Sequence, residues 1–495
     1  MKLKQILFIV MLIGFISSCK KSDILDINVD PNRPTAVSAT PELVLSAALN
    51  STGAIYNNPT NGNSYFTFAG LWLGQIGYSG NFAIATENIS YALTNNFGAG
   101  LFANLYDNNE DYDFVEKKGV AQGNGFYRAV GMFMKAYNFQ TLVDVYGNVP
   151  YTQALQGTAN SKPAYDQGKE IYVDLAKKMD TAISLFKLAV SGNTSINGDI
   201  MFNGDANLWL AFANTVKLRL LLRQSEVNGA AAKTQAASLS GGFLTTDATV
   251  NPGYSASGGK ANPFYEQNIN PSNGVSDQQS LRAGNYGVTF YQTNNDPRLG
   301  KFYSPVAGTT NTYQGNAFGD QGLTNTKTSG VGPGVLKSAS QPSVIMLAAE
   351  SYFLQAEAVL RGWITVSGET TQTLFEKGVT ASFLYLGLTS AQATTYYTQA
   401  GNKQTTWSAT TGFQEQLALI IRQKYAAETF INELEPYNDY RRLHLPADIP
   451  LSTSPFSTGI FPNRLLYPQR EIDVNGANVA AQGNITPGTK VWWQP

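Results

Sequence analysis

Apolar positions recur at helical spacing in several separate parts of the chain. Within residues 167–190 they form one stripe, at Ile171, Leu175, Met179, Ile183 and Phe186. The same spacing predicts helices at residues 40–50, 124–146, 206–226, 343–361, 369–387 and 413–434, and one beginning near residue 100. Asp166 and Asp205 stand where N-caps are expected, and Gly147 and Gly362 where helices should end. The pattern predicts a mostly α-helical protein.

Two long tracts lack this periodicity. Residues 227–342 are rich in Gly, Asn, Ser, Thr and Pro with scattered aromatic residues, and residues 436–495 contain many prolines. The first tract is too aromatic for disorder, and long ordered loops in compact folds are usually functional. We therefore predict a helical scaffold, mainly 39–226 and 343–435, which carries a loop-rich region formed by 227–342 and 436–495. Helix pairs split by a long insertion favour an α-solenoid scaffold.

The first residues have the pattern of an export signal. Lys2 and Lys4 precede a short apolar run that ends in Ile16-Ser17-Ser18-Cys19, and Cys19 is the only cysteine of the chain. The run is too short to cross a bilayer, and its position before the cysteine is similar to the lipobox of bacterial lipoproteins. We predict a lipoprotein signal peptide at 1–18, lipidation of Cys19 (by palmitate or another acyl chain), a lipid-anchored tether at 19–38, and a single domain at 39–495. The alternative is an ordinary signal in which Cys19 is incidental.

Composition narrows the range of partners. The chain has 34 Lys and Arg against 35 Asp and Glu, so no basic excess is available for phosphate contacts and nucleic acid is not an expected partner. Charged residues make up only 14% of the chain, and Asn, Gly, Ser, Thr, Gln and Tyr are abundant. Such a polar, weakly charged surface suits neutral, hydroxyl-bearing ligands or other protein surfaces.

Short motifs follow one another in a fixed order. They are LDINVDPN at 25–32, KAYNFQTLVDVYGNVPY at 135–151, WLAFANTVKLRLLLR at 209–223, Asp296-Pro297-Arg298, AAESYFLQAEAVLRGW at 348–363, and Phe461-Pro462-Asn463-Arg464 with Tyr467-Pro468 and Glu471. In this order they resemble the SusD/RagB family of outer-membrane nutrient-binding lipoproteins of Bacteroidetes-type bacteria, in its SusD-like branch. The match spans nearly the whole chain after Cys19.

The resemblance implies tetratricopeptide-like helix pairs on one side of the fold and an irregular ligand-binding region on the other. It implies a TonB-dependent SusC-like β-barrel transporter as partner, over which the lipoprotein acts as a lid, and neither catalysis nor a cofactor. We therefore expect an outer-membrane protein, anchored by lipid and facing the cell exterior, that captures a nutrient, in the first instance a glycan or oligosaccharide. The chain departs from surface lipoproteins of these bacteria just after the cysteine. These proteins often carry acidic residues there, whereas this chain has Lys20-Lys21-Ser22-Asp23.

Catalytic motifs give the enzyme alternative little support. His444 is the only histidine, which excludes a zinc site with several histidines, and we interpret it as structural. Neither a Gly-x-Ser-x-Gly elbow nor a P-loop is present in the sequence. Paired carboxylates for glycoside hydrolysis depend on spatial proximity, so a surface glycoside hydrolase stays an alternative.

A calcium-like spacing occurs at residues 107–113. Asp107, Asn109, Asp111 and Asp113 match the first ligand positions of a calcium loop, but the chain has Tyr112 where that loop needs glycine, and Lys118 where it needs glutamate. We interpret these residues as the exposed face of a helix and predict no metal site.

Two polar, aromatic segments are the candidate ligand-binding region. The first contains Trp72, Gln75, Tyr78, Asn81 and Phe82; the second contains Arg282, Tyr286, Tyr313 and Asn316. Aromatic faces stack on the C–H surfaces of sugars, and amide or charged side chains bond the hydroxyls. Trp72 and Tyr78 are the strongest candidates because a mobile, glycine-rich segment is a poor place to bury an aromatic ring, although core packing is the alternative for each of these residues.

The ligand stays open at this point, because starch, another glycan, a glycan-derived oligosaccharide and a peptide all fit the pattern. A helical-repeat adaptor that binds a protein or peptide is the third possible function, since the helix pairs alone are compatible with it.

Overall fold

The structure is a computed structural model that describes residues 39–57, 65–257, 259–271, 274 and 279–495. The predicted signal peptide, Cys19 and the tether lie outside these residues. The α-helices are α3 (Pro41–Asn57), α4 (Tyr65–Trp72), α5 (Thr86–Ser90), α6 (Ala99–Ala121), α7 (Gly125–Tyr146), α8 (Gly168–Ser191), α9 (Ala206–Arg223), α10 (Ser225–Ala236), α11 (Pro263–Asn268), α12 (Asn285–Thr293), α13 (Leu299–Phe302), α14 (Ala348–Leu360), α15 (Thr371–Tyr385), α16 (Ser390–Tyr397), α17 (Gly412–Glu428), α18 (Leu434–Leu443) and α19 (Gln469–Ala480). The strands are β1 (Ile76–Tyr78), β2 (Val149–Pro150), β3 (Tyr165–Asp166), β4 (Ala248–Val250), β5 (Leu281–Ala283) and β6 (Ser343–Met346).

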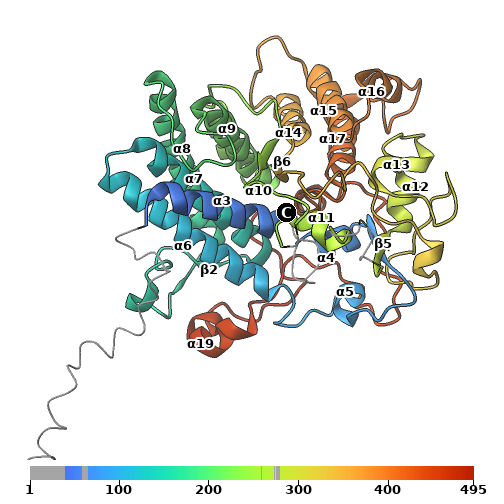
Figure 1. Cartoon of the computed structure of the whole chain (residues 1–495), viewed down its shortest axis with the longest axis horizontal. Coiled ribbons are helices and arrows are strands. Elements are labelled where there is room, and N and C mark those ends of the chain that lie inside the picture. Colours follow the sequence, from blue (N-terminus) through green and yellow to red (C-terminus); the bar gives the residue numbers. More distant parts are fainter. Residues whose placement is uncertain (1–38, 58–64, 258, 272–273, 275–278) are drawn as a thin grey trace, which may run out of the picture.

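Consecutive helices pack side by side in two groups. In the first group α6 packs against α7, α7 against α8 and α8 against α9; in the second, α14 packs against α15 and α17. Figure 1 shows the first group in blue to green and the second in orange, with α9 and α14 adjacent between them. This arrangement confirms the prediction of a mostly helical fold, and its two helix groups come from separate parts of the chain. Among the described residues, no helix has both the length and the apolar character needed to cross a membrane.

Local signals explain where several helices begin and end. The Asp205 carboxylate accepts hydrogen bonds from the backbone N–H groups of Asn207 and Leu208, which confirms its predicted role as N-cap of α9. Helix α7 ends at Gly147, whose φ of 76° favours glycine, as predicted. The prediction of Asp166 as N-cap of α8 was wrong. Asp166 belongs to β3, and its carboxylate accepts from the N–H groups of Tyr151 and Thr152 instead.

Two predicted helices differ from the observed ones. The helix expected at 343–361 begins only at Ala348, because Ser343–Met346 form strand β6 and pair with β4. The Asp247 carboxylate accepts a hydrogen bond of 2.8 Å from the Ala348 N–H and so satisfies an amide at the start of α14. The helix expected at 413–434 ends at Glu428, and a separate helix, α18, starts at Leu434.

The loop-rich region contains more regular structure than its composition predicts. Helices α11 to α13, most of α10, and strands β4 and β5 lie within 227–342, and α19 and most of α18 lie within 436–495. Most of these elements are short, so their side-chain periodicity is difficult to recognise in the sequence. The predicted helix near residue 100 is α6, which carries Asp107, Asn109, Asp111 and Asp113 along its length. The prediction that all four lie on an exposed face was wrong for Asn109, which is fully buried and accepts a hydrogen bond of 3.1 Å from the Asn138 amide. His444 is the C-cap of α18 with a φ of 53°, in agreement with a structural role.

A cluster of charged side chains, here called the ionic core, lies where the two helix groups meet. Its members are Arg219 and Arg223 of α9, Glu350 and Glu357 of α14, Lys424 of α17, and Glu435, Asp439 and Arg442 of α18. Each of these side chains is 4% exposed or less. Buried charges are tolerated when opposite charges are paired, and here four cations meet four anions.

Candidate functional site

The structure joins the two predicted ligand-binding segments. Strands β1 and β5 are antiparallel, with Gly77 opposite Arg282 and Tyr78 opposite Leu281. The Asn316 side-chain amide donates to the Tyr78 carbonyl oxygen at 2.6 Å across 238 residues of sequence. In Figure 1 the blue segment of α4 and α5 accordingly lies beside β5. The two segments therefore form one continuous part of the molecule.

Three of the nine predicted ligand residues are buried. Trp72 is fully buried, its ring is stacked with Phe97 at a centroid distance of 6.0 Å, and its Nε1 donates to the Asn88 carbonyl oxygen. Gln75 is also fully buried and donates to the Thr429 hydroxyl at 2.8 Å, while Asn316 is 2% exposed. The expectation that the glycine-rich surroundings leave Trp72 exposed was therefore wrong.

Close packing is the physical reason for this error. A Cβ added to Gly80 would lie 1.9 Å from the Gln321 carbonyl oxygen, and one added to Gly70 would lie 2.6 Å from Ile76 Cδ1. Glycine is common both where the backbone needs an unusual conformation and where chain segments approach closely, and these glycines permit close approach. The segment is glycine-rich because it is densely packed.

Four predicted residues are half-buried and have structural contacts. The Tyr78 hydroxyl accepts a hydrogen bond of 2.8 Å from the Asn88 amide, and burial raises the pKa of Tyr78. Arg282 donates from Nη2 to the Thr328 carbonyl oxygen at 2.6 Å, and burial lowers its pKa. Tyr313 packs against the core, and Tyr286 donates from its hydroxyl to Asp448 Oδ1 at 2.9 Å.

Asn81 and Phe82 are exposed and lie against a loop that the sequence analysis did not single out. The Asn81 side-chain amide donates to Asn325 Oδ1 at 3.2 Å, and the Asn325 N–H donates to Asn81 Oδ1 at 3.1 Å. Gln321 Nε2 donates to the Phe82 carbonyl oxygen at 3.0 Å, and the Phe82 ring is 39% exposed. We call Asn81, Phe82, Gln321 and Asn325 the Phe82 surface.

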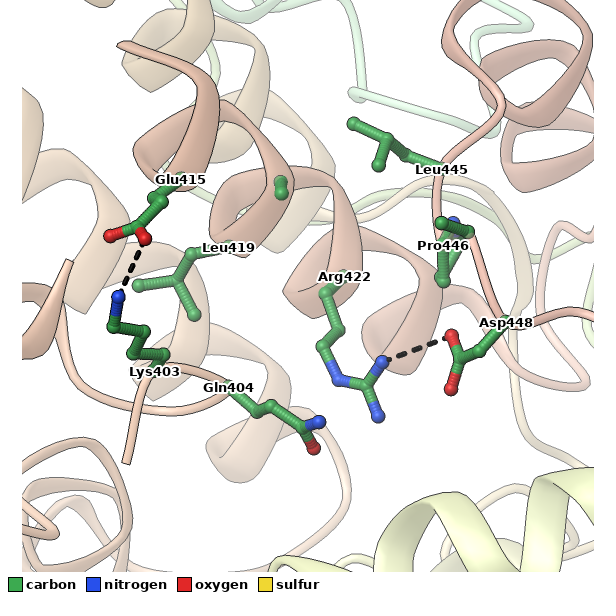
Figure 2. A pocket seen from close by; sticks show the side chains of 10 residues that line it. Lys403, Gln404, Glu415, Leu419, Arg422, Leu445, Pro446 and Asp448 are labelled. Atoms are coloured by element: carbon green, nitrogen blue, oxygen red, sulfur yellow. Dashed lines mark hydrogen bonds and ion pairs between the residues drawn. The ribbon is translucent and has the colours of Figure 1, made fainter. Parts of the chain in front are cut away.

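A pocket of about 440 Å³ lies next to Tyr286, and Figure 2 shows it from close by. It is lined by Lys403, Gln404, Glu415, Ala418, Leu419, Arg422, Leu445, Pro446, Ala447 and Asp448. Arg422 Nη1 lies 3.3 Å from Asp448 Oδ1, and Lys403 Nζ lies 2.5 Å from Glu415 Oε1. Because the Tyr286 hydroxyl bonds the same Asp448 oxygen, this predicted residue stands at the edge of the pocket. We call this cavity the Arg422 pocket.

One stretch of chain connects the Arg422 pocket with the loop that leads to the Phe82 surface. After Asp448 the chain reaches Ser452, whose N–H donates to the Tyr91 hydroxyl, and Thr453, whose N–H donates to the Phe318 carbonyl oxygen at 2.9 Å. Phe318 belongs to the loop that continues to Gln321.

Sequence reasoning missed Gln321, Asn325, Arg422 and Asp448. Arg422 lies among apolar positions of α17, where one arginine gives no functional signal. The two amide residues lie in a tract rich in such residues, so only the fold distinguishes them from their neighbours.

The chemistry of these sites is that of binding through polar and aromatic side chains. Among the described residues, no group of three or more His, Cys, Asp or Glu is arranged to hold a metal ion. An exposed ring beside fixed amides can stack on one face of a ligand and bond its polar substituents.

Comparison with known proteins extends to nearly the whole chain. The family model named SusD-like, and described as starch-binding and associating with the outer membrane, matches residues 31–468. No curated protein matches this chain. A SusD-like protein from Bacteroides thetaiotaomicron is 24% identical, with a TM-score of 0.76 over 91% of this chain and 98% of that one.

Two further solved structures have the same fold. A chitin-binding SusD homolog from Flavobacterium johnsoniae is 24% identical, with a TM-score of 0.75 over 91% of this chain and 98% of that one. Another structure, of a chitin-binding protein, is 25% identical, with a TM-score of 0.73 over 92% of this chain and 100% of that one. With its helix pairs, its loop-built surface and a family match over most of its length, the chain belongs to the SusD-like family.

Proposed function

We propose that this protein is a non-catalytic, lipid-anchored protein of the outer cell surface that captures a glycan or oligosaccharide and delivers it to a TonB-dependent SusC-like transporter. Three observations support the proposal. The family is described as starch-binding and associated with the outer membrane, two structures of the same fold are of chitin-binding proteins, and Cys19 lies in a lipobox-like sequence.

The Phe82 surface is the observation that carries the binding part of the proposal. It combines an exposed aromatic ring with the amides of Asn81, Gln321 and Asn325. A sugar ring offers a C–H face for stacking and hydroxyls that both donate and accept, so this combination suits a neutral carbohydrate. The amides already bond one another and the backbone, so little side-chain freedom remains to be lost on binding.

The same surface supports binding rather than hydrolysis. Glycoside hydrolysis requires two carboxyl groups on opposite sides of the scissile bond. None of the four residues of the Phe82 surface is a carboxylic acid. We therefore assign this surface to capture of the intact glycan.

A glycan array tests capture, with the chain and its Phe82→Ala and Asn325→Ala variants. We expect at least one glycan to bind and each variant to weaken that binding about fivefold, because stacking and amide bonds each contribute about 1 kcal/mol. Leu43→Ala is the matched control, since Leu43 is 65% exposed on α3 of the scaffold. The absence of any glycan hit would refute capture, and release of shorter sugars would establish a hydrolase instead.

Purification of the chain from outer membranes tests delivery. We expect a β-barrel transporter to co-purify with the lipid-anchored protein and to separate from a Cys19→Ala variant that is not anchored. A chain that purifies alone from the membrane would contradict the transporter partnership. A transporter complex that binds no glycan would favour the adaptor alternative.

A further inference from the structure

The Arg422 pocket is separate from the Phe82 surface and has its own polar centre. Arg422 and Asp448 face each other at 3.3 Å, while Lys403 and Glu415 form a second ion pair at 2.5 Å. Figure 2 shows the two pairs at opposite ends of the pocket, with Leu419 between them. Two cations and two anions line the cavity, so their formal charges cancel.

Both members of the Arg422–Asp448 pair contact side chains of α12. The Arg422 guanidinium lies over the Phe290 ring at 4.1 Å, and its side chain is only 12% exposed. The Tyr286 hydroxyl donates to Asp448 Oδ1 at 2.9 Å. Side chains that are fixed before binding lose little entropy when a ligand arrives, which is a property of a built binding site.

The pair also retains hydrogen-bonding capacity. At 3.3 Å, the contact between Arg422 and Asp448 is longer than the usual 2.7–2.9 Å of a charge-assisted hydrogen bond. Within the described residues, the recorded contacts of Asp448 use Oδ1, so Oδ2 is open to accept. In Figure 2 only one terminal nitrogen of Arg422 reaches Asp448, and the other points away from it. A donor and an acceptor therefore stand side by side in the pocket.

We propose that the Arg422 pocket is a second sugar subsite, in which Arg422 donates to one hydroxyl and Asp448 accepts from the neighbouring hydroxyl of a neutral sugar ring. The proposal rests on glycan capture and extends it to a named class of ligand. Ala418 and Leu445, both half-buried, provide an apolar wall for the C–H face of the ring, and about 440 Å³ is within the usual size of a small-molecule site. A uronic acid is disfavoured, because the balanced charges of the lining give its carboxylate no net attraction to offset the cost of leaving water.

The chain between the two sites limits their separation along this path. Residues 448–453 lead from the pocket to the contact of Thr453 with Phe318, and five residues extend over at most about 18 Å. The three further residues from Phe318 to Gln321 add at most about 11 Å.

Saturation-transfer NMR tests the subsite with full-length chain in detergent, using Phe82→Ala as the parent so that the Phe82 surface does not contribute. The probes are glucose, galactose, mannose and N-acetylglucosamine, with glucuronate and galacturonate as acidic counterparts. We expect at least one neutral probe to bind the parent, and to bind about tenfold more weakly when Arg422→Gln or Asp448→Asn is added, since each removes a charge-assisted hydrogen bond. The uronates should bind more weakly than the matching neutral sugars.

Lys377→Gln is the matched control, because Lys377 is 48% exposed in its pair with Glu369, lies outside the pocket lining, and its loss should leave neutral binding within twofold. No neutral binding to the parent, a preference for uronates, or binding that is unchanged by Arg422→Gln and Asp448→Asn would overturn the subsite. Thermal unfolding checks that each variant is folded. If Arg422→Gln unfolds, Asp448→Asn alone tests the subsite, because the Asp448 side chain is 57% exposed and its replacement should be tolerated. Failure of glycan capture itself would appear separately, as a wild-type chain that binds nothing on the glycan array.

Discussion

Arg223 and Glu435 are 212 residues apart in sequence, yet Arg223 Nη2 lies 2.7 Å from both carboxylate oxygens of Glu435. Arg219 and Lys424 lie within 3.8 Å and 3.6 Å of the same carboxylate. Burial alone would raise the pKa of Glu435, but these three positive charges hold it well below its usual range. This contact joins α18, near the end of the chain, to α9 of the first helix group.

Replacing Glu435 with glutamine should therefore destabilise the protein strongly. The change leaves buried cations without their counter-charge, and breaking a buried ion pair from one side costs about 3–5 kcal/mol. The measurement is the free energy of unfolding from guanidinium chloride titration at neutral pH. Glu226→Gln is the matched control, because the Glu226 side chain is 33% exposed in its pair with Arg361 and such pairs contribute about 0–1 kcal/mol. Equal effects of the two substitutions would contradict this role of the ionic core.

Glu357 should make the protein sensitive to acid. Burial opposes ionisation, but Arg442 and Arg361 lower the pKa of Glu357 to about 2 from 4.5. A carboxyl with a lowered pKa contributes stability above its unfolded value of 4.5, and this contribution is lost as the pH falls through about 2. We expect Glu357→Gln to remove about 3 kcal/mol at neutral pH and to flatten the decline in unfolding free energy between these two pH values. Unfolding titrations across that range provide the measurement, and an unchanged slope would contradict the assignment.

Glu428 should lower the unfolding free energy at neutral pH, whereas Glu357 raises it. Burial and the neighbouring Glu350 raise the pKa of Glu428 well above 4.5, and neither of its side-chain oxygens has a hydrogen-bond partner in the described part of the chain. A group with a raised pKa contributes its full stability below its unfolded pKa, and that stability is lost as the pH rises toward the folded value, by about 1.4 kcal/mol per pH unit. Glu428→Gln should therefore raise the unfolding free energy at neutral pH and change it little near pH 4. Destabilisation at neutral pH alone would show that the carboxylate is satisfied in its ionised form.

Gly80→Ala should impair ligand binding through the position of the 321 loop. Its Cβ would lie 1.9 Å from the Gln321 carbonyl oxygen, so the backbone that carries Gln321 must move. We expect glycan binding at the Phe82 surface to fall at least tenfold, while the helical content measured by circular dichroism stays constant. Gly476→Ala is the control, because a Cβ there meets no atom within 4 Å. If Gly80→Ala binds the glycan with wild-type affinity, the Phe82 surface is not part of the binding site.

The long helices were predictable because each has enough turns to display its apolar stripe. Residues 167–190 were expected as a helix and α8 spans Gly168–Ser191. The short elements were not predictable in this way: Ser343–Met346 is buried on both faces, so its side chains show neither helical nor alternating spacing. The boundary at Ala348 also depends on Asp247, about 100 residues away, which no local pattern reveals.

The candidate site was predictable as two segments, but not as a set of contacting residues. The segments around Tyr78 and Arg282 were both identified, and the β1–β5 pairing brings them together. The exposure of individual side chains was less predictable. Trp72 and Phe82 stand in the same glycine-rich stretch, and only the close approach of other chain segments decides that one is covered and the other 39% exposed.

The pairing of β1 with β5 also makes the backbone of the site independent of the side chains that would contact a ligand. Backbone hydrogen bonds join the segments, and backbone groups are the same for every side chain that the strands carry. The exposed side chains of Asn81 and Phe82 and the half-buried side chain of Asn325 can therefore be exchanged while these backbone bonds stay intact. A library randomised at these three positions would be a direct route to variants of this protein that select different sugars.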